Sequence, residues 1–516
     1  IFGFPANSIL SDSLTKIPGI SQLNITCSVS DPNLSLYTKP NSTTLSPTAS
    51  NTPSGIKVYL FEALRPTPEL SFAIRTLQAK AGVVCTASHN PKEYNGYKAY
   101  WNDGGQLVPP HDKNVITEVE AIQSIDDVKW EGGAALIELI GSDMDEAYIK
   151  MVKSLSIYPE VIAQQHHLKI VYTPIHGTGI TMVPKVLAAY GFTQVHIVEE
   201  QSIPDGNFPT VNYPNPEESE TMSIGLAKAK EIDADIVLGT DPDADRVGVG
   251  VKNHKGEWVL MNGNQTAVLA FAYMMEARNA KGSAKPNDMV ITTIVTTEMI
   301  NEVARQNNVN CYNVLTGFKW VAELVKEKEG KENYIIGGEE SFGLMIGDQI
   351  RDKDAVSAVA ILCEMAAYEK SKGRTLFDKL IELYVRYGFY YENLISITKK
   401  GMNGQAEIAK MMEGYRQSPP THIDGEAVAT LLDYELGVGK NLKTGDTWKI
   451  QLPKSNVLQF ITESGTKISA RPSGTEPKIK FYFSVHTTLQ DKAGFDTTYQ
   501  WLQDKINTII SSMQLK

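Results

Sequence analysis

The chain has 516 residues, more than one hydrophobic core usually serves, so we expect three or four domains. An apolar fraction of 42% and a charged fraction of 21% are typical of a water-soluble globular protein. The net charge of −11 argues against nucleic acid or an anionic membrane as the main partner. The four cysteines are far apart, as expected for free thiols in a reducing compartment. No apolar run reaches the ~18 residues of a membrane span and no signal-peptide core follows Ile1, so we expect a cytoplasmic protein.

From residue 56 onward, strand-like and helix-like stretches alternate in three successive groups. The strands are expected at 56–61, 82–86, 168–174, 195–200, 235–240, 289–295, 311–315 and 333–338. The helices are expected at 69–79, 181–190, 217–231, 298–306 and 319–328, with a long helical stretch at 354–386. This rhythm predicts three α/β domains with mixed or parallel sheets. From about residue 390 strands and turns dominate, and a helix near 492–513 ends a fourth, α+β domain.

The first polar loop, Thr86-Ala87-Ser88-His89-Asn90-Pro91, directly follows an apolar strand. Ser88 is a candidate nucleophile, although a serine needs a neighbouring base, a metal or prior phosphorylation. His89 and Lys98 can supply proton transfer or charge. A Ser/Asn helix cap beside a solvated histidine explains the loop equally well.

The second polar loop carries aspartate at every second position, namely Asp241, Asp243 and Asp245. In an extended segment these carboxylates point the same way and repel one another unless a cation neutralises them. Hard oxygen ligands suit Mg²⁺. A calcium EF-hand is excluded, because its required glycine is replaced by Arg246 and its glutamate by Lys252. A solvated acidic turn remains the alternative.

The third polar loop, Gly-Glu-Glu-Ser-Phe-Gly, places the paired carboxylates of Glu339 and Glu340 beside the hydroxyl of Ser341. Such a pair suits the hydroxyls of a sugar, but acidic residues also favour an ordinary helix N-terminus. Lys353 follows shortly and can bind phosphate or transfer protons.

The fourth polar loop combines two hydroxyls, a glycine and flanking cations, which suits a phosphate. Its residues are Arg471, Ser473, Gly474, Thr475 and Lys478. It lacks the GxxxxGK[ST] order of a nucleotide-binding P-loop. A simple hairpin turn is the alternative.

A further glycine pair, Gly177-Thr178-Gly179, lies between a strand and a helix with Glu199 about twenty residues on, as in dinucleotide-binding folds. Met182 occupies the place of the third glycine. We therefore interpret the segment as a strand-to-helix turn, which leaves a nicotinamide enzyme as a distant alternative.

In this order, the loops TASHNP, DPDADR, GEESFG and RPSGTEP resemble those of the α-D-phosphohexomutase superfamily, which includes phosphoglucomutases and phosphomannomutases. The segment NPKEYNGYKAYWNDGGQL is most similar to the branch with bacterial phosphoglucomutases and animal phosphopentomutase. The resemblance implies a heart-shaped molecule around a central cleft, with α/β domains at 1–147, 148–256 and 257–388 and an α+β domain at 389–516. The family's N-terminal strand and its glycine-rich, arginine-bearing turn have no match in residues 1–54.

The resemblance also implies a role for each loop. Ser88 would carry a phosphoryl group and share Mg²⁺ with Asp241, Asp243 and Asp245, while Arg246 would steady the reacting phosphate. Lys98 would move protons, with His89 and Lys353 as further candidates. The residues that would bind the sugar and its distal phosphate are Thr316, Gly317, Glu339, Ser341, Arg471, Ser473, Gly474 and Thr475.

We therefore expect an isomerase that interconverts hexose 1-phosphate and hexose 6-phosphate, of glucose and also of mannose. A sugar 1,6-bisphosphate would be its intermediate and activator. Small sugar phosphates would be its partners, and the chain would be a monomer or a weak homodimer. The alternatives are a phosphopentomutase or a sugar-bisphosphate synthase with the same site, and a non-catalytic sugar-phosphate-binding protein.

Overall fold

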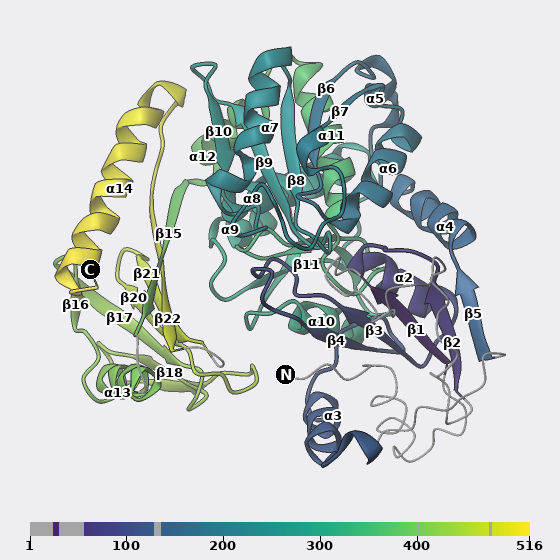
Figure 1. Cartoon of the computed structure of the whole chain (residues 1–516). Coiled ribbons are helices and arrows are strands. Elements are labelled where there is room, and N and C mark those ends of the chain that lie inside the picture. Colours follow the sequence, from purple (N-terminus) through teal and green to yellow (C-terminus); the bar gives the residue numbers. More distant parts are fainter. Residues whose placement is uncertain (1–23, 30–55, 128–135, 400–402, 474–476, 516) are drawn as a thin grey trace. The chain divides into compact units, whose positions relative to one another are not determined.

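The structure is a computed structural model (Figure 1) that describes residues 24–29, 56–127, 136–399, 403–473 and 477–515. Its residues form two compact units. The first unit comprises 1–291 and 317–377, and the second comprises 292–316 and 378–516. Within the described ranges, no helix is long and apolar enough to cross a membrane.

The first sheet has the order β4-β3-β1-β2-β5 and lies in the first unit. Its strands are β1 (Asn24–Val29), β2 (Lys57–Phe61), β3 (Ala81–Cys85), β4 (Tyr97–Trp101) and β5 (Ile137–Ile140). All are parallel except β4, which is antiparallel to β3. Helix α2 (Thr67–Thr76) packs on β1 and β3, where its Leu70 and Ile74 join Val84 and Tyr100 in a buried core.

Strand β1 corrects the expectation that residues 1–54 contain no counterpart of an N-terminal strand. The backbone of Asn24–Val29 pairs in parallel with two neighbours, so that Ile25 lies opposite both Val58 and Ala81. A strand with a partner on each side is stabilised mainly by contacts with residues distant in the chain. Local sequence therefore carried little signal for it.

The second sheet has the order β10-β9-β8-β6-β7 and also lies in the first unit. Its strands are β6 (Lys169–Thr173), β7 (Gln194–Ile197), β8 (Ile236–Thr240), β9 (Val247–Lys252) and β10 (Trp258–Met261). Strands β7, β6 and β8 are parallel, with β7 at the edge, whereas β9 and β10 are antiparallel additions. Helix α7 (Ser219–Ile232) packs on β6 and β8, with Met222 buried against Val171 and Val237.

The third sheet includes strand β11 (Asp288–Thr293), which is parallel to β13 (Asn333–Gly338), and β13 is antiparallel to β14 (Leu344–Ile346). Helix α11 (Ala355–Lys370) packs against both β8 and β14 and is buried on nearly every side, as expected of a helix without a polar face. Asp354 caps its N-terminus by accepting from the backbone nitrogens of Val356 and Ser357 at 2.9 and 3.2 Å.

The remaining helices of the first unit connect and cover these sheets. They are α3 (His111–Glu120), α4 (Ser142–Lys153), α5 (Pro159–Gln164), α6 (Val183–Tyr190), α8 (Gly263–Ala280) and α10 (Lys319–Lys328). The long helical stretch expected at 354–386 is two helices, α11 and α12 (Leu376–Tyr387). Gly373 separates them with a φ of +71°, a left-handed conformation that ends a helix and favours glycine.

The second unit is built on an antiparallel sheet with the order β15-β22-β21-β20-β17-β18-β19, and β16 pairs with β17. The strands are β15 (Phe389–Thr398), β16 (His422–Ile423), β17 (Glu426–Asp433), β18 (Val438–Asn441), β19 (Thr447–Lys449), β20 (Leu458–Thr462), β21 (Lys467–Pro472) and β22 (Lys478–Thr487). Helices α13 (Gly404–Gln417) and α14 (Phe495–Ser512) pack on it (Figure 1). The same unit contains α9 (Met299–Gln306) and β12 (Asn310–Val314). Three mixed α/β sheets and a β-rich C-terminal part confirm the predicted fold class.

Residues 292–316 are attached to the antiparallel sheet of the second unit by buried polar contacts. The backbone oxygen of Ile294 accepts from Gln459 Nε2 at 2.7 Å and from Lys467 Nζ at 3.1 Å. Lys467 also forms an ion pair with Glu298. Because a buried polar group costs free energy unless it is paired, these contacts hold the segment in one position on the sheet.

Candidate active site

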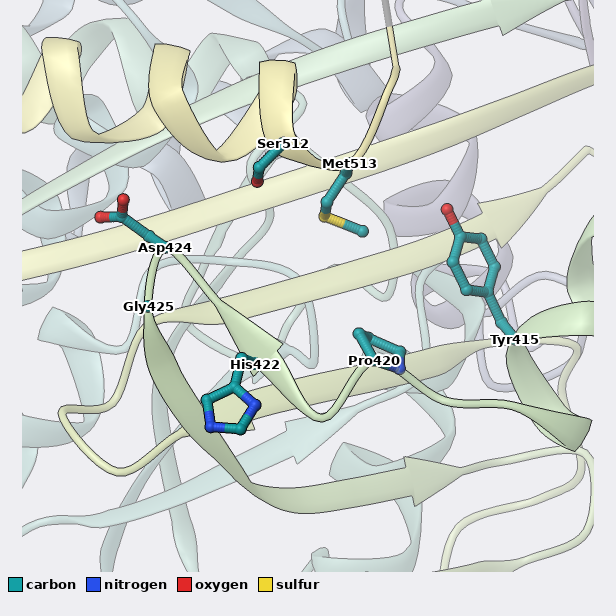
Figure 2. Close-up of a pocket in the computed structure, with 7 residues that line it drawn as sticks. All are labelled: Tyr415, Pro420, His422, Asp424, Gly425, Ser512 and Met513. Carbon is teal, nitrogen blue, oxygen red and sulfur yellow. The ribbon is translucent and has the colours of Figure 1, made fainter.

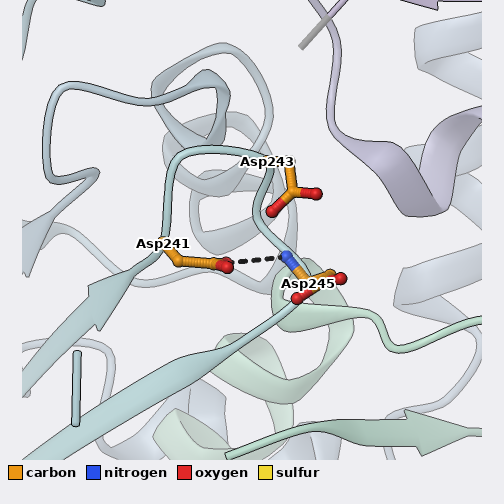
Figure 3. A group of neighbouring side chains, drawn as sticks. All are labelled: Asp241, Asp243 and Asp245. Atoms are coloured by element: carbon orange, nitrogen blue, oxygen red, sulfur yellow. Dashed lines mark hydrogen bonds between the residues drawn. The ribbon is translucent and has the colours of Figure 1, made fainter. Parts of the chain in front are cut away.

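The three aspartates of the second polar loop converge directly after the fully buried strand β8 (Figure 3). Asp241, Asp243 and Asp245 are all buried, and one carboxylate oxygen of each lies within 4.8 Å of the others. Asp241 Oδ1 accepts from the backbone nitrogens of Asp245 and Arg246 at 3.0 and 2.9 Å. Asp241 Oδ1 therefore stabilises the backbone of its own loop.

The expectation that an extended segment brings the three carboxylates together is wrong, because the segment is a turn. Ala244 has a φ of +53°, in the left-handed region. Its backbone nitrogen donates to Asp241 O at 2.9 Å, as in a turn. The alternation of aspartates therefore did place the carboxylates together, but through the folding of a tight loop.

The loop of Ser88 lies against this cluster. Ser88 Oγ donates to Asp241 Oδ2 at 3.4 Å and is 3.2 Å from His89 Nδ1. Ser88 has a φ of +54°, which costs a residue with a side chain of order 1 kcal/mol, and its nitrogen is held by Thr86 Oγ1 at 2.8 Å. Gly96 packs so closely on this loop that a Cβ there would lie 2.1 Å from Thr86 O. The hydroxyl of Ser88 is thus held facing the aspartates.

Two lysines from distant elements reach the same carboxylates. Lys98 Nζ, on β4, lies 2.8 Å from Asp243 Oδ2 and 3.0 Å from Asp245 Oδ2. Lys353 Nζ, in the loop before α11, lies 3.2 Å from Asp245 Oδ2. Burial alone would lower the pKa of Lys98, but Asp243 and Asp245 raise it well above its usual value. Lys98 is therefore protonated and brings a positive charge to the two carboxylates.

The pKa values of the acidic and imidazole groups differ with their neighbours. Burial, with repulsion from Asp245 and Asp243, raises the pKa of Asp241 well above its usual range. Burial would do the same for Asp245, but Lys353 and Lys98 outweigh it and lower its pKa. Burial, with repulsion from Arg246, lowers the pKa of His89 to about 3, so its imidazole is neutral.

The arrangement fits a divalent cation. Asp243 Oδ1 and Asp245 Oδ1 are buried and have no hydrogen-bond partner among the residues that the structure describes. Buried carboxylate oxygens without partners are rare and usually signal a missing ion or water. Together with Asp241 Oδ2 they form a set of hard oxygen donors, which Mg²⁺ prefers. Ser88 Oγ is placed to share such a cation.

The third polar loop connects two antiparallel strands, β13 and β14, so the alternative of a helix N-terminus is excluded. Glu339 is buried and lies 3.9 Å from Lys353 Nζ, while Ser341 is half-buried. Burial raises the pKa of Glu339 to about 7, although Lys353 opposes this. A Cβ on Gly343 would lie 2.2 Å from Lys353 Cδ, so only glycine lets the lysine reach the loop.

The remaining predicted residues lie elsewhere in the chain. Gly317 lies in the turn before α10 with a φ of +107°, and Thr316 is the last residue of its segment of the second unit. Arg471 and Ser473 lie at the end of β21, where Ser473 N donates to Lys478 O at 2.7 Å. The fourth loop therefore joins two antiparallel strands. Gly474 and Thr475 lie outside the described residues.

The aspartate loop, which carries Asp241, Asp243 and Asp245, is also held by residues that the motifs did not indicate. The backbone nitrogen of Thr67, at the start of α2, donates to Asp243 O at 2.9 Å, and its hydroxyl lies 3.2 Å from Asp243 Oδ2. Thr178 N donates to Pro242 O at 2.7 Å, and a Cβ on Gly177 would lie 2.3 Å from Pro242 Cα. The glycine pair is indeed a strand-to-helix turn. Its further role, packing on the aspartate loop, had no sequence signal.

A separate surface pocket of ≈ 470 Å³ lies in the second unit (Figure 2). It is lined by Tyr415, Pro420, His422, Asp424, Gly425, Ser512 and Met513. None of the predicted site residues lines it. The candidate active site is therefore assigned from the loops of the first unit.

Sequence comparison places this geometry in a family. Residues 48–126, 146–256 and 262–387 match the alpha/beta/alpha domains I, II and III of phosphoglucomutase/phosphomannomutase, respectively. A phosphoglucomutase of Staphylococcus epidermidis is 37% identical over 457 residues, which make up 87% of this chain and 81% of the relative. For a Staphylococcus aureus phosphoglucomutase the identity is 36% over 460 residues, with coverages of 89% and 80%.

Solved structures agree at the level of the fold. Paramecium pp63/parafusin, a phosphoglucomutase in an open form, superposes with a TM-score of 0.66 at 17% identity, covering 98% of this chain and 91% of its own. A putative phosphomannomutase from Thermus thermophilus gives a TM-score of 0.64 at 20% identity, with coverages of 93% and 90%. Because sequence identity with the staphylococcal enzymes extends over four-fifths of their length, the resemblance seen in the four loops is confirmed, and the chain belongs to the phosphoglucomutase/phosphomannomutase family.

Proposed function

We propose that this phosphohexose mutase, an isomerase, interconverts the 1-phosphate and 6-phosphate of glucose, and also of mannose, by passing a phosphoryl group through Ser88. The observation that carries the proposal is the position of Ser88 Oγ, 3.4 Å from Asp241 Oδ2 beside a buried aspartate cluster. The relation to phosphoglucomutases over most of the chain supports the choice of hexose phosphates.

The reaction follows from the groups that surround Ser88. When Ser88 is phosphorylated, a sugar hydroxyl attacks the phosphorus, so that the bond to Ser88 Oγ breaks and a bond to the sugar oxygen forms. Phosphoryl transfer needs positioning and charge neutralisation more than covalent chemistry. A bound Mg²⁺, held by Asp241, Asp243, Asp245 and the Ser88 group, would neutralise charge on the phosphoryl oxygens.

The neighbouring side chains of the first unit would handle protons and hydroxyls. Lys98 and Lys353 are cations beside the reacting centre, and neutral His89 is within 3.2 Å of Ser88 Oγ to exchange its proton. Glu339 and Ser341, in the loop that approaches Lys353, would bind sugar hydroxyls. Arg246 would bind the reacting phosphate.

The other end of the sugar needs a second anchor. We assign the distal phosphate to Arg471, Ser473, Gly474 and Thr475, and further sugar contacts to Thr316 and Gly317. The product of the first transfer is then a hexose 1,6-bisphosphate, which turns around and returns its other phosphoryl group to Ser88. This assignment is supported by the flanking cations of the fourth loop.

We further propose four domains, at 1–147, 148–256, 257–388 and 389–516. The one-sheet-per-domain pattern supports them. We also propose a cytoplasmic enzyme that acts as a monomer or a weak homodimer. The free thiols of Cys311 and Cys363 support a reducing compartment.

Mass spectrometry of the intact chain tests the phosphoserine directly. After incubation with glucose 1,6-bisphosphate, the wild-type chain should gain the mass of one phosphoryl group, and Ser88→Ala should gain none and lose turnover. Ser202→Ala, which removes a serine hydroxyl outside the site, should behave as wild type. Turnover retained in Ser88→Ala would remove the nucleophile, and faster turnover of ribose 1-phosphate than of glucose 1-phosphate would overturn the substrate choice.

A further inference from the structure

The side chain of Arg246 has one strong partner, and that partner lies outside the four loops. Its backbone is fixed by the aspartate loop, because its nitrogen donates to Asp241 Oδ1 at 2.9 Å. Its guanidinium, with the side chain 15% exposed, donates from Nη1 to Glu217 Oε1 at 2.9 Å. The position of the guanidinium therefore depends on Glu217.

A competing partner lies close by. Arg246 Nε and Asp245 Oδ1 form a long ion pair of 3.9 Å, a distance at which there is no hydrogen bond. Both atoms are buried, and neither has a hydrogen-bond partner among the residues that the structure describes. Asp245 Oδ1 is one of the oxygens that fit a cation. A small rotation of Arg246 would pair the two groups and occupy that oxygen.

The loop that carries Glu217 is anchored on the rest of the first unit. Its backbone nitrogen donates to Asn215 Oδ1 at 3.1 Å, which forms a side-chain turn. Pro216 packs on β9, where a Cβ on Gly248 would lie 2.8 Å from Pro216 Cβ. Further back in this loop, Thr210 Oγ1 contacts His176 Nε2 at 2.9 Å. The carboxylate thus approaches Arg246 from an anchored loop.

From this geometry we propose that Glu217 is a positioning residue that holds the Arg246 guanidinium away from Asp245, so that Asp245 Oδ1 stays open to the divalent cation. The inference rests on the proposed metal site. Removal of Glu217 lets Arg246 form a hydrogen-bonded ion pair with Asp245, because an unpaired buried cation is unfavourable and Asp245 is a nearby carboxylate. Loss of Glu217 therefore weakens metal binding through Arg246, although Glu217 contacts no metal ligand.

Mn²⁺ binding to the purified full chain, followed by electron paramagnetic resonance of the free ion, provides a readout other than turnover. Glu217→Ala should raise the Mn²⁺ dissociation constant by roughly tenfold, the scale of coupling between neighbouring charged groups. In an Arg246→Leu background the same substitution should change it by less than about twofold. Glu218→Ala, which removes the adjacent exposed carboxylate, should leave Mn²⁺ affinity unchanged.

Each contrary result has a distinct meaning. An unchanged dissociation constant in Glu217→Ala, or an equal loss in the Arg246→Leu background, would overturn the positioning role, since an acidic charge acting at a distance needs no arginine. Wild-type Mn²⁺ binding that survives Asp243→Asn would instead reject the aspartate site of the proposed function, and the inference with it. Circular dichroism of every variant checks that the fold is retained.

Discussion

Tyr100 and Asp352 connect the two lysines that reach Asp245. Tyr100 follows Lys98 by two residues on β4, so both side chains leave the same face of the strand. Its hydroxyl donates to Asp352 Oδ2 at 2.7 Å, and Asp352 Oδ1 accepts from the backbone nitrogen of Lys353 at 2.8 Å. A buried pair thus fixes one lysine relative to the other.

Tyr100→Phe should lower kcat by about tenfold with little change in KM. The loss of one hydrogen bond to a carboxylate, about 1.5 kcal/mol, loosens the Lys353 loop, although Gln106 Nε2 still donates to Asp352 Oδ2 at 2.8 Å. Because phenylalanine fills the same buried space, the fold should be retained. Steady-state kinetics beside Tyr97→Phe, a change at an exposed tyrosine of the same strand, gives the comparison. Equal kcat values in both variants would show that the two lysines do not depend on this link.

Among the elements, the turn at Gly177 supports the aspartate loop. A Cβ there would lie 2.6 Å from Pro242 O as well as 2.3 Å from Pro242 Cα, so backbone would have to move. Overpacking of this kind typically lowers the free energy of unfolding by about 2 kcal/mol. The loop that carries the metal ligands would shift with Pro242.

We expect Gly177→Ala to lower the Tm by several degrees and to weaken Mn²⁺ binding together. Gly414→Ala is the matched control, because Gly414 lies within α13 with no atom in reach of an added Cβ. Alanine favours a helix over glycine by about 1 kcal/mol, so this variant should melt no lower than wild type. Calorimetry that shows no loss in Gly177→Ala would contradict the tight packing.

In the second unit, strand β15 carries a carboxyl group with an unusual pKa. Burial raises the pKa of Glu392 to about 7, although Thr297, Ser484 and Lys467 favour its charged form. An acid whose pKa is raised by folding binds its proton more tightly in the folded state. The contribution of Glu392 to stability is therefore fully present below the usual pKa of glutamate and is lost as the pH rises towards about 7.

Glu392→Gln should flatten this dependence and make the chain more stable than wild type at pH 8. The gain is about 2 kcal/mol, less than the full shift implies because the side chain is only half-buried. Urea unfolding at pH 5 and pH 8 measures it. If wild type and variant lose stability equally between these values, Glu392 is not the group responsible.

At the scale of the whole molecule, the proposed function also needs Arg471, a residue of the second unit, to bind the distal phosphate. Arg471→Ala should raise KM for glucose 1-phosphate by at least tenfold, since a charge-assisted hydrogen bond to phosphate contributes about 1.5–3 kcal/mol. Phosphorylation of Ser88 by a bisphosphate at high concentration should persist. Lys454→Ala, an exposed cation of the second unit, serves as the control. An unchanged KM would remove the fourth loop from the site.

The sequence by itself determined the chemistry of the loops and the strands that precede them. Buried strands such as β3 and β8 are short apolar runs, and the polar residues after them are local signals that survive without neighbours. This is why the sequence predicts Ser88 and Asp241 as site residues, and why the family was recognised. The strand Asn24–Val29 was missed, because its pairing depends on two neighbouring strands that are distant in the sequence.

Only the tertiary structure decided which distant side chains contact and position those loops. Thr67 meets Asp243 across 176 positions of sequence, and Tyr100 meets Asp352 across 252. No local periodicity encodes such contacts, because each joins residues that are far apart in the chain and belong to different sheets or loops. The turn that gathers the aspartates and the selection of Glu217 as the partner of Arg246 have the same origin. Their free energy depends on burial and distance, which a linear pattern does not contain.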